Sequence, residues 1–186
     1  MFKRLKTVDV AQTLIGQVII VQNSRGPVSG LITETEAYTQ EDPACHTYRG
    51  RKTKRNEAMF KAAGHLYIYF IYGMYHCLNI VTEAEGRGCA VLIRSIEPIE
   101  GQSIMQANRG QNCPKAQWCN GPAKLVMALG VQSDWNGLKL GDPNTPVQIQ
   151  DQGYRPQGIH SSTRVGISKG QGLPWRFSCQ EFKHHE

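Results

Sequence analysis

The chain lacks the features that mark several large classes of protein. No apolar run approaches the roughly 20 residues that a transmembrane helix needs, and residues 1–6 lack the apolar core of a signal peptide. The six cysteines include no C-x-x-C pair, so neither a zinc ribbon nor a thioredoxin-like motif is predicted. We therefore expect an intracellular protein without membrane association, whose thiols are reduced and mostly buried.

Metal-ligand patterns are also scarce, and repeats and low-complexity tracts are absent. Cys45 precedes His46, and the chain ends in His184-His185-Glu186, but neither group has further ligands at a spacing that suits a metal. We predict no metal site. A length of 186 residues with 40% hydrophobic content is enough for one sizeable core, which predicts a single domain over residues 1–186.

Basic residues outnumber acidic ones, with 21 Lys and Arg against 15 Asp and Glu, and the formal net charge is +6. Excess positive charge favours anionic partners, although many basic proteins bind none. Residues 47–56 contain no acid, and they interleave hydroxyl, amide and glycine groups with five basic side chains: Arg49, Arg51, Lys52, Lys54 and Arg55. This loop suits phosphate contacts, while a solvated loop or a sorting signal is the plainer interpretation.

Short hydrophobic segments separated by turn residues predict a mixed α+β fold around a largely antiparallel sheet. Pro122 and Gly130 enclose helix-forming apolar residues and predict the clearest helix. The other expected elements are a helix near 8–15, strands at 17–21 and 28–38 around a turn at 23–27, a polar loop at 39–57, strands at 65–71, 75–82 and 89–94, and loops with short strands at 136–157.

The strand expected around residues 32–38 carries two carboxylates and a tyrosine on one side. Period-two alternation sends Ile32, Glu34, Glu36 and Tyr38 to the same face. An exposed strand face would look the same. If the face instead lines a cleft, Tyr38 offers a stacking surface for a planar ligand, and Glu36 offers a base that deprotonates water.

The segment 66–81 reads as two apolar strands joined at Tyr72-Gly73-Met74. A solvated hairpin tip normally carries Asn, Asp or Ser beside glycine, so the bulky Tyr72 and Met74 require an explanation. One explanation is a wedge that enters a base step and offsets the cost of unstacking. The other is a tip that folds back onto the protein.

Three further residues present a choice between structural and functional roles. Arg94 ends the strand expected at 89–94, where it would pair with a carboxylate, and pairing near Glu36 would orient a shared water. Asn79 lies inside a strand and needs hydrogen-bond partners. His46 is either a satisfied structural histidine or a second stacking platform.

These residues and their neighbours resemble the alkyladenine DNA glycosylases, also called methylpurine or 3-methyladenine DNA glycosylases. The matching motifs keep the family's order from residue 14 to 177 and so cover nearly the whole chain. They include Glu34-Thr35-Glu36-Ala37-Tyr38, His46 followed by Arg49-Gly50-Arg51-Lys52-Thr53-Lys54-Arg55-Asn56, Tyr67 to Tyr75, Cys77-Leu78-Asn79, Val91-Leu92-Ile93-Arg94, Gly121-Pro122-Ala123-Lys124-Leu125, Arg164-Val165-Gly166-Ile167 and Pro174-Trp175-Arg176-Phe177.

The resemblance implies a role for each matched position. Glu36 would be the general base, and Arg94 would help to hold the attacking water. Tyr38 and His46 would sandwich the flipped base, with Asn79 limiting which purines enter. Tyr72, with Met74 beside it, would intercalate into DNA, and the DNA backbone contacts would be Arg51, Thr53, Arg55 and Lys124.

The resemblance also implies a fold, a partner and a compartment. The fold would be one compact α+β domain with a curved, mostly antiparallel sheet and a hairpin that inserts into DNA. The partner would be double-stranded DNA with a damaged purine, bound by a monomer that needs no cofactor. The compartment would be the bacterial cytoplasm, close to the nucleoid, or the nucleus of a eukaryote.

The expected reaction is hydrolysis of the N-glycosidic bond by a water that Glu36 deprotonates. The expected substrates are alkylated or deaminated purines, namely 3-methyladenine, 7-methylguanine, hypoxanthine and ethenoadenine. No lysine adjoins Glu36 in the sequence, and the resemblance implies a water nucleophile, so we predict a monofunctional enzyme that leaves an abasic site. Two alternatives stay open: a non-catalytic nucleic-acid-binding module, and a carbohydrate hydrolase that uses Glu34 and Glu36 as its carboxylate pair.

Overall fold

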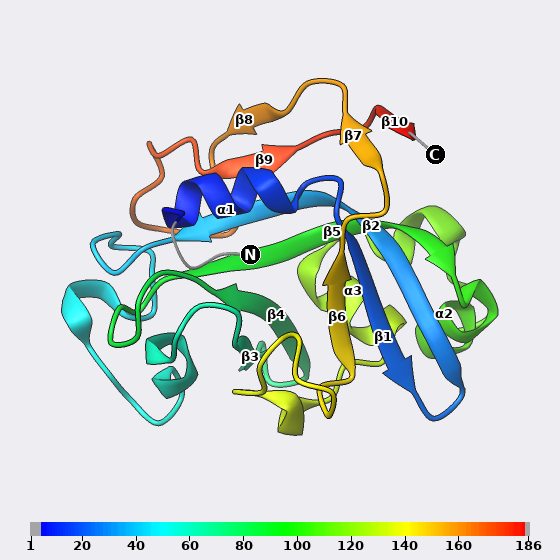
Figure 1. The fold of residues 1–186 in the computed structure, drawn as a ribbon, viewed down its shortest axis with the longest axis horizontal. Coiled ribbons are helices and arrows are strands. Elements are labelled where there is room, and N and C mark those ends of the chain that lie inside the picture. The colour runs from blue at the N-terminus through cyan, green and yellow to red at the C-terminus, as the bar shows by residue number, and fades with distance from the viewer. Residues whose placement is uncertain (1–4, 185–186) are drawn as a thin grey trace.

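A strongly curled antiparallel sheet organises the computed structural model, which describes residues 5–184 (Figure 1). Its main path has the order β3-β4-β5-β2-β1-β6, and β9 lies beside β2 with β8 on its other side. The strands are β1 (Val18–Asn23), β2 (Gly26–Tyr38), β3 (Leu66–Ile71), β4 (Tyr75–Val81), β5 (Ala90–Glu100), β6 (Val147–Gln150), β8 (His160–Ser162) and β9 (Arg176–Ser178). The predicted α+β class with a curved antiparallel sheet is confirmed.

The long strand β2 changes its partner on one side along its length. Gly26 to Leu31 pair with β1, whereas Glu34 to Glu36 pair with β9, and β5 lies on the other side from Ser29 to Tyr38. The register between β2 and β5 shifts on both sides of Glu34. Such bulges bend a strand and increase its twist, so the sheet curls along the segment that carries Glu34 and Glu36.

The helices cover the sheet. The helix α1 (Thr7–Leu14) packs on β2, where the Thr35 hydroxyl donates to the Ala11 carbonyl at 2.8 Å. The helices α2 (Gln102–Arg109) and α3 (Pro122–Leu129) pack on each other, and α3 also contacts β4 and β5. The short elements are η1 (Tyr48–Gly50), η2 (Glu57–Phe60), η3 (Lys115–Gln117) and η4 (Ser133–Trp135), with β7 (Tyr154–Pro156) and β10 (Phe182–His184) forming a separate ribbon.

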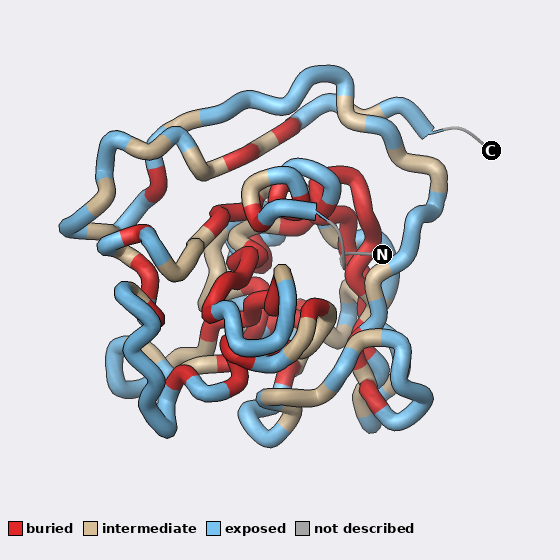
Figure 2. The backbone as a smooth tube through the Cα atoms, turned by 60° about the vertical axis from the view of Figure 1, so that its left-hand side comes forward, coloured by how far each residue is buried: buried red, intermediate tan, exposed pale blue. Residues whose placement is uncertain are grey.

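Buried residues concentrate inside the curl of the sheet (Figure 2). The main hydrophobic cluster draws large, fully buried side chains from α1, β2, β4, β5 and α3. A second, smaller cluster, which includes Met59 and Tyr67, lies under the segment that joins β2 to β3. Five of the six cysteines are buried, as expected.

One strand differs from the sequence-based expectation, and one helix was not expected at all. The strand predicted at 89–94 extends to Glu100, because Ile96 continues the core face after Arg94. Arg94 therefore lies inside β5 rather than at its end. The helix α2 was not predicted, because Met105 is its one buried residue and the apolar stripe is too thin to recognise.

No helix among residues 5–184 combines the length and the apolarity that crossing a bilayer requires.

Candidate active site

A cavity of about 330 Å³ opens beside the sharply curled part of β2. This volume lies at the lower end of the range typical of small-molecule pockets. Six of the residues singled out from the sequence line it, and they come from β2, β4, β5, the turn after β3 and the loop before η1. These residues are Glu36, Tyr38, His46, Tyr72, Asn79 and Arg94.

Glu36 has no exposed side-chain surface, yet its carboxylate is well supplied with donors. One oxygen, Oε1, accepts from the backbone N–H of Val165 at 2.9 Å and lies 3.3 Å from a guanidinium nitrogen of Arg94. The other oxygen, Oε2, accepts from the Tyr38 hydroxyl at 2.8 Å. A carboxylate has about four lone-pair positions. One position on Oε2 is therefore left for a further donor.

Tyr38 is held at its hydroxyl group and over one face of its ring. Its hydroxyl donates to Glu36, and the Arg164 guanidinium lies 4.6 Å from the centre of its ring. Burial raises the pKa of the Tyr38 phenol, and the charge of Glu36 raises it further. The hydroxyl consequently stays protonated and available as a donor at neutral pH.

A carboxylate cluster, defined as Glu34, Glu36, Arg94 and Arg176, reaches the cavity through Glu36 and Arg94. Arg94 bridges the two glutamates, and its Nε donates to Glu34 Oε1 at 2.8 Å. Arg176 donates to the same Glu34 oxygen at 2.5 Å. Burial by itself lowers the pKa of Arg94, but the charges of Glu36 and Glu34 outweigh it and raise that pKa above its ordinary value.

Glu34 and Glu36 are not presented to the same space. Glu36 lines the cavity, whereas Glu34 is not among the described residues that do so. Glu34 instead binds two guanidinium groups through one oxygen. The pair of opposed carboxylates that a carbohydrate hydrolase would need is therefore not assembled here.

His46 and Asn79 line other parts of the same cavity. His46 Nδ1 lies 2.9 Å from the Tyr67 hydroxyl, and its ring meets Tyr69 edge-on at 4.7 Å. Burial lowers the pKa of His46, and the charge of Arg55 contributes further. Asn79 is buried, and its side-chain amide nitrogen donates to the Tyr67 carbonyl at 3.0 Å. This bond satisfies one of the polar groups of the side chain.

The hairpin tip, defined as residues 72–74 between β3 and β4, is solvent-exposed. Tyr72 is 79% exposed and Met74 is 65% exposed, so the tip does not fold back onto the protein. Tyr72 and Gly73 both have positive φ, at 53° and 70°. Asn or Gly normally occupies such positions, and a bulky residue there is strained by roughly 1 kcal/mol. A strained, exposed tyrosine at the edge of a cavity favours a role in binding.

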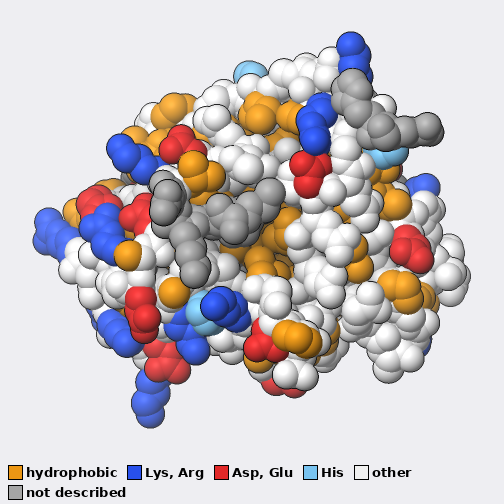
Figure 3. Space-filling view, in the orientation of Figure 1, with side chains coloured by type: hydrophobic (Ala, Val, Ile, Leu, Met, Phe, Trp, Pro, Cys, Tyr) orange, Lys and Arg blue, Asp and Glu red, His pale blue; other side chains and the backbone are white. Residues whose placement is uncertain are grey.

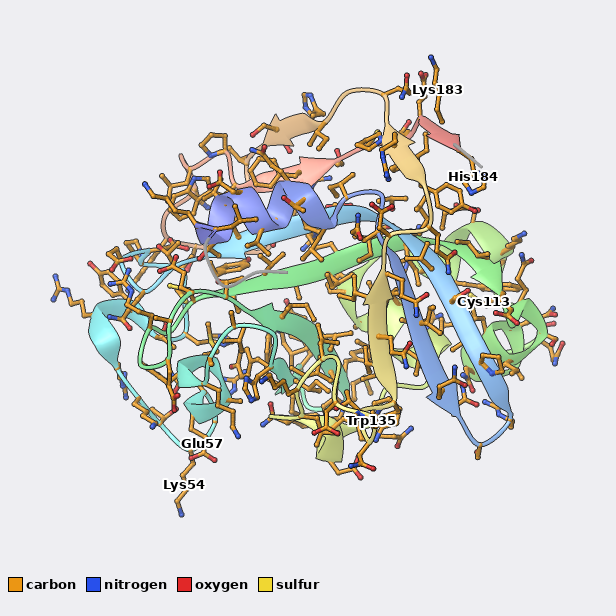
Figure 4. All side chains as sticks on the ribbon, viewed as in Figure 1. Lys54, Glu57, Cys113, Trp135, Lys183 and His184 are labelled. Atoms are coloured by element: carbon orange, nitrogen blue, oxygen red, sulfur yellow. The ribbon has the colours of Figure 1, made fainter. Side chains whose placement is uncertain are left out.

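The basic loop, defined as residues 49–55, adopts an exposed conformation held from within by Asn56. The Asn56 amide donates to the carbonyls of His46 and Arg51, and its oxygen accepts from the Thr53 N–H at 2.7 Å. Lysine and arginine side chains, with several acidic ones among them, gather over the left and lower left of Figure 3, and Lys54 points away from the protein in Figure 4.

The four residues assigned to DNA backbone contacts differ in their surroundings. Arg51 and Thr53 have exposed side chains. Arg55 is also exposed, but it donates to the Phe70 carbonyl at 3.0 Å and lies 5.5 Å from the Tyr69 ring, so it braces β3. Lys124 lies on α3 and donates to Asn120 at 2.8 Å. The two residues before it, Pro122 and Ala123, line the cavity.

Sequence reasoning missed the residues that support the cavity from outside. Arg164 pairs with Asp42 through two hydrogen bonds, and both side chains are fully buried. Burial by itself lowers the pKa of Arg164, but the hydrogen bonds and charge of Asp42 outweigh it and raise that pKa. The two positions are 122 residues apart, and the only available signal was an arginine next to Val165-Gly166.

Within residues 5–184 no group of three or more His, Cys, Asp or Glu side chains is arranged to hold a metal ion. His184 Nε2 donates to the Gln152 carbonyl, while His185 and Glu186 of the terminal motif lie outside the described residues.

Comparison with known proteins gives consistent results over almost the full chain. The family model described as methylpurine-DNA glycosylase (MPG) matches residues 1–183. Proteins named "Putative 3-methyladenine DNA glycosylase" from Methanoculleus marisnigri and Francisella tularensis subsp. tularensis are 45% and 42% identical to this chain, each over 180 residues. The alignments cover 95% and 96% of this chain and 91% and 92% of those proteins.

The family model and the relatives place the protein among the DNA repair hydrolases that act on N-glycosyl bonds. Within that class, the chain belongs to the methylpurine-DNA glycosylase family. The family resemblance drawn from the sequence motifs is thereby confirmed.

Proposed function

We propose that the protein extrudes alkylated or deaminated purines from duplex DNA and hydrolyses their N-glycosidic bond with a water that Glu36 activates. The proposed substrates are 3-methyladenine, 7-methylguanine, hypoxanthine and ethenoadenine, and the product is an abasic site. The observation that carries the proposal is the state of Glu36, a carboxylate with two hydrogen-bond donors and one guanidinium in place and one acceptor position left at the wall of a cavity.

The hydrolysis follows from this geometry. Glu36 has no accessible surface in the free protein, so a small displacement of the side chains over Oε2 must admit the attacking water. That water donates to the remaining lone pair of Oε2 and is deprotonated as it attacks the anomeric carbon of the nucleotide sugar. The bond to the purine breaks, and the purine leaves with the bonding electrons. Positive charge builds on the sugar during this step, and a fixed carboxylate close to it stabilises that charge. Arg94 holds the carboxylate in place.

The rest of the cavity suits recognition of a flipped base. Tyr38 and His46 supply flat rings for stacking. Asn79 supplies an amide that forms hydrogen bonds with some groups on the base edge and excludes others. The exposure of Tyr72 and Met74 supports a role in filling the space that the base vacates in the duplex. The basic loop and Lys124 would contact phosphates, which position the duplex without reading its sequence.

The decisive experiment measures base release from duplexes that each carry one of the four proposed lesions. Glu36→Gln is expected to reduce the single-turnover rate by about 10² to 10⁴-fold, the usual contribution of a general base. Glu97→Gln, an exposed glutamate on β5, is the matched control and should keep the wild-type rate. Excision by Glu36→Gln at the wild-type rate would remove Glu36 from this role.

The same experiment separates this function from that of a non-catalytic binding module. A module of that kind would bind the lesion duplexes and release no base from any of them. A panel of four lesions also ranks the substrates, because the leaving ability of a methylated, positively charged purine differs from that of neutral hypoxanthine or ethenoadenine. Release of one lesion alone would narrow the proposed range.

We also propose that the enzyme is monofunctional and leaves the DNA strand intact. Strand cleavage by a glycosylase requires an amine that attacks the sugar, and Lys169 is the single lysine that lines the cavity within residues 5–184. Its side chain is exposed. Borohydride should trap no covalent complex between the protein and DNA. Trapping by the wild type that is lost in Lys169→Gln would overturn this part of the proposal.

A further inference from the structure

The loop 164–170 forms one wall of the cavity but contains no regular secondary structure. Its inner residues, 165 to 169, all line the cavity, and Gly166 has positive φ with open space around it. Such a loop has few contacts of its own to define its position. Its first residue, Arg164, provides most of them.

Arg164, at the start of the loop, forms hydrogen bonds with three other residues: Ala37, Asp42 and Gly170. Its terminal nitrogens donate to both oxygens of Asp42, to the Ala37 carbonyl at 2.9 Å, and to the Gly170 carbonyl at 3.2 Å. The contact with Gly170 joins the two ends of the loop. The contact with Ala37 joins the loop to β2 between Glu36 and Tyr38.

The same guanidinium reaches two groups that the proposed reaction uses. It lies 4.6 Å from the centre of the Tyr38 ring, and Arg164 itself is not among the described residues that line the cavity, so it supports the ring from outside. The residue that follows, Val165, donates its backbone N–H to Glu36 Oε1 at 2.9 Å. A shift of Arg164 would therefore move the stacking ring and a donor to the carboxylate together.

Stability alone is a poor explanation for this ion pair. Both charged side chains are fully removed from water, and the Arg164 Nε–H has no acceptor within residues 5–184. Desolvation of two charges is costly, and apolar residues of similar size are often at least as stabilising. What apolar residues cannot provide is a set of directional bonds that fixes one geometry.

We propose that Arg164, held by Asp42, is a positioning residue that fixes the Tyr38 ring and the 164–170 loop against Glu36 in the geometry required for excision. This inference rests on the proposed function, because it assigns Arg164 a task in the same reaction. Arg164 contacts neither substrate nor water in this scheme. Its effect passes through Tyr38 and Val165.

The test compares Arg164→Lys with a variant that is destabilised elsewhere. Lysine keeps the charge but cannot make the paired bonds to Asp42. Ile19→Ala removes buried atoms from β1, a strand with no residue at the cavity, and so provides the matched loss of melting temperature. Single-turnover excision and binding to a duplex with an abasic analogue are measured for both variants, well below their melting temperatures.

Arg164→Lys is expected to slow excision by about 10 to 100-fold, since small misplacements of reacting groups have effects of this size. Its affinity for the abasic duplex should change by less than about threefold, because the DNA backbone contacts are intact. Ile19→Ala should excise at nearly the wild-type rate. Equal rates for the two variants would overturn the inference, and so would a loss of duplex affinity that accounts for the slower excision.

Nuclear magnetic resonance gives a readout that does not depend on activity. The Tyr38 ring signals should move in Arg164→Lys and stay in place in Ile19→Ala, because only the first change takes the guanidinium away from that ring. Unmoved Tyr38 signals in Arg164→Lys contradict the inference. A wild-type protein that releases no base contradicts the proposed function instead, and the two failures are thus distinguishable.

A double variant covers the case in which Arg164→Lys does not fold. Asp42→Leu with Arg164→Met removes both charges and keeps the volume, a replacement that buried ion pairs often tolerate. We expect it to fold and to excise about 10 to 100-fold more slowly than the wild type. Excision at the wild-type rate would show that packing alone positions Tyr38 and would overturn the inference.

Discussion

In the carboxylate cluster each charged group lies within 3.3 Å of an opposite charge, and Glu36 has no exposed surface. At the hairpin tip, which also lines the cavity, Tyr72 is 79% exposed and adopts a positive φ. The cluster is complete within the free protein, so its geometry is set before any substrate arrives. The tip buries little of its apolar surface, so it stays available for the proposed contact with DNA. The two regions thus divide the proposed task into fixed chemistry and adaptable binding.

Removing Arg94 should have the largest effect on the carboxylate cluster, both on stability and on excision. Arg94→Met leaves Glu36 buried without a cation, and unpaired buried charges cost about 3 to 5 kcal/mol of stability. Excision should also fall by more than about 10²-fold, because the carboxylate is no longer held. Denaturant unfolding and single-turnover excision measure the two effects. Arg176→Met is the matched control and should have the smaller effect on excision, since Arg176 contacts Glu34 and not Glu36.

The hairpin tip should behave in the opposite way, with a loss of excision and no loss of stability. Tyr72→Asn keeps a residue that tolerates positive φ and removes the ring, so stability should stay equal or rise by up to about 1 kcal/mol. Excision should slow by about tenfold, the equivalent of 1.4 kcal/mol of unstacking energy no longer offset. Tyr72→Phe, which keeps the ring, should retain most of the rate. A rate for Tyr72→Asn equal to the wild type would exclude the wedge.

The basic loop provides a finer distinction between binding and support. Replacing Arg51 with Gln removes one exposed charge, and the slope of log affinity against log salt should become shallower by about one. Replacing Arg55 should change that slope and also loosen β3, because Arg55 donates to the Phe70 carbonyl. Duplex binding is measured over a salt series for each variant. Unchanged slopes in both would exclude phosphate contacts in this loop.

The smallest expected effect concerns pH and His46. The pKa of His46 is lowered in the folded protein, by burial first and by Arg55 second, from an ordinary value of about 6.5. Between the lowered pKa of the folded state and the ordinary pKa of the unfolded state, the unfolded chain binds more protons than the folded protein. The free energy of unfolding should therefore fall as the pH drops through that window. His46→Gln should show a shallower decline of melting temperature below about pH 6.5. Identical declines would mean that other groups cause it.

Local patterns in the sequence were sufficient where a residue's role depends on its neighbours in the chain. Pro122 and Gly130 predicted α3 because they act within one turn of the helix. The alternation of strand β2 placed Glu36 and Tyr38 on one face, and the structure joins them by a hydrogen bond. Alternation could not reveal that Glu34 would be diverted from the cavity by two arginines, because the bulges on both sides of it arise from pairing with β5.

By itself the sequence determined the class of fold, the family and six of the residues that line the cavity, because these follow from short periodic patterns and from motifs in a set order. Only the tertiary structure decided which groups hold Glu36. Val165 and Arg94 reach it from 129 and 58 positions away, and Arg164 reaches Asp42 across 122. Contacts of that span depend on how the curled sheet brings distant segments together, and no local pattern records them.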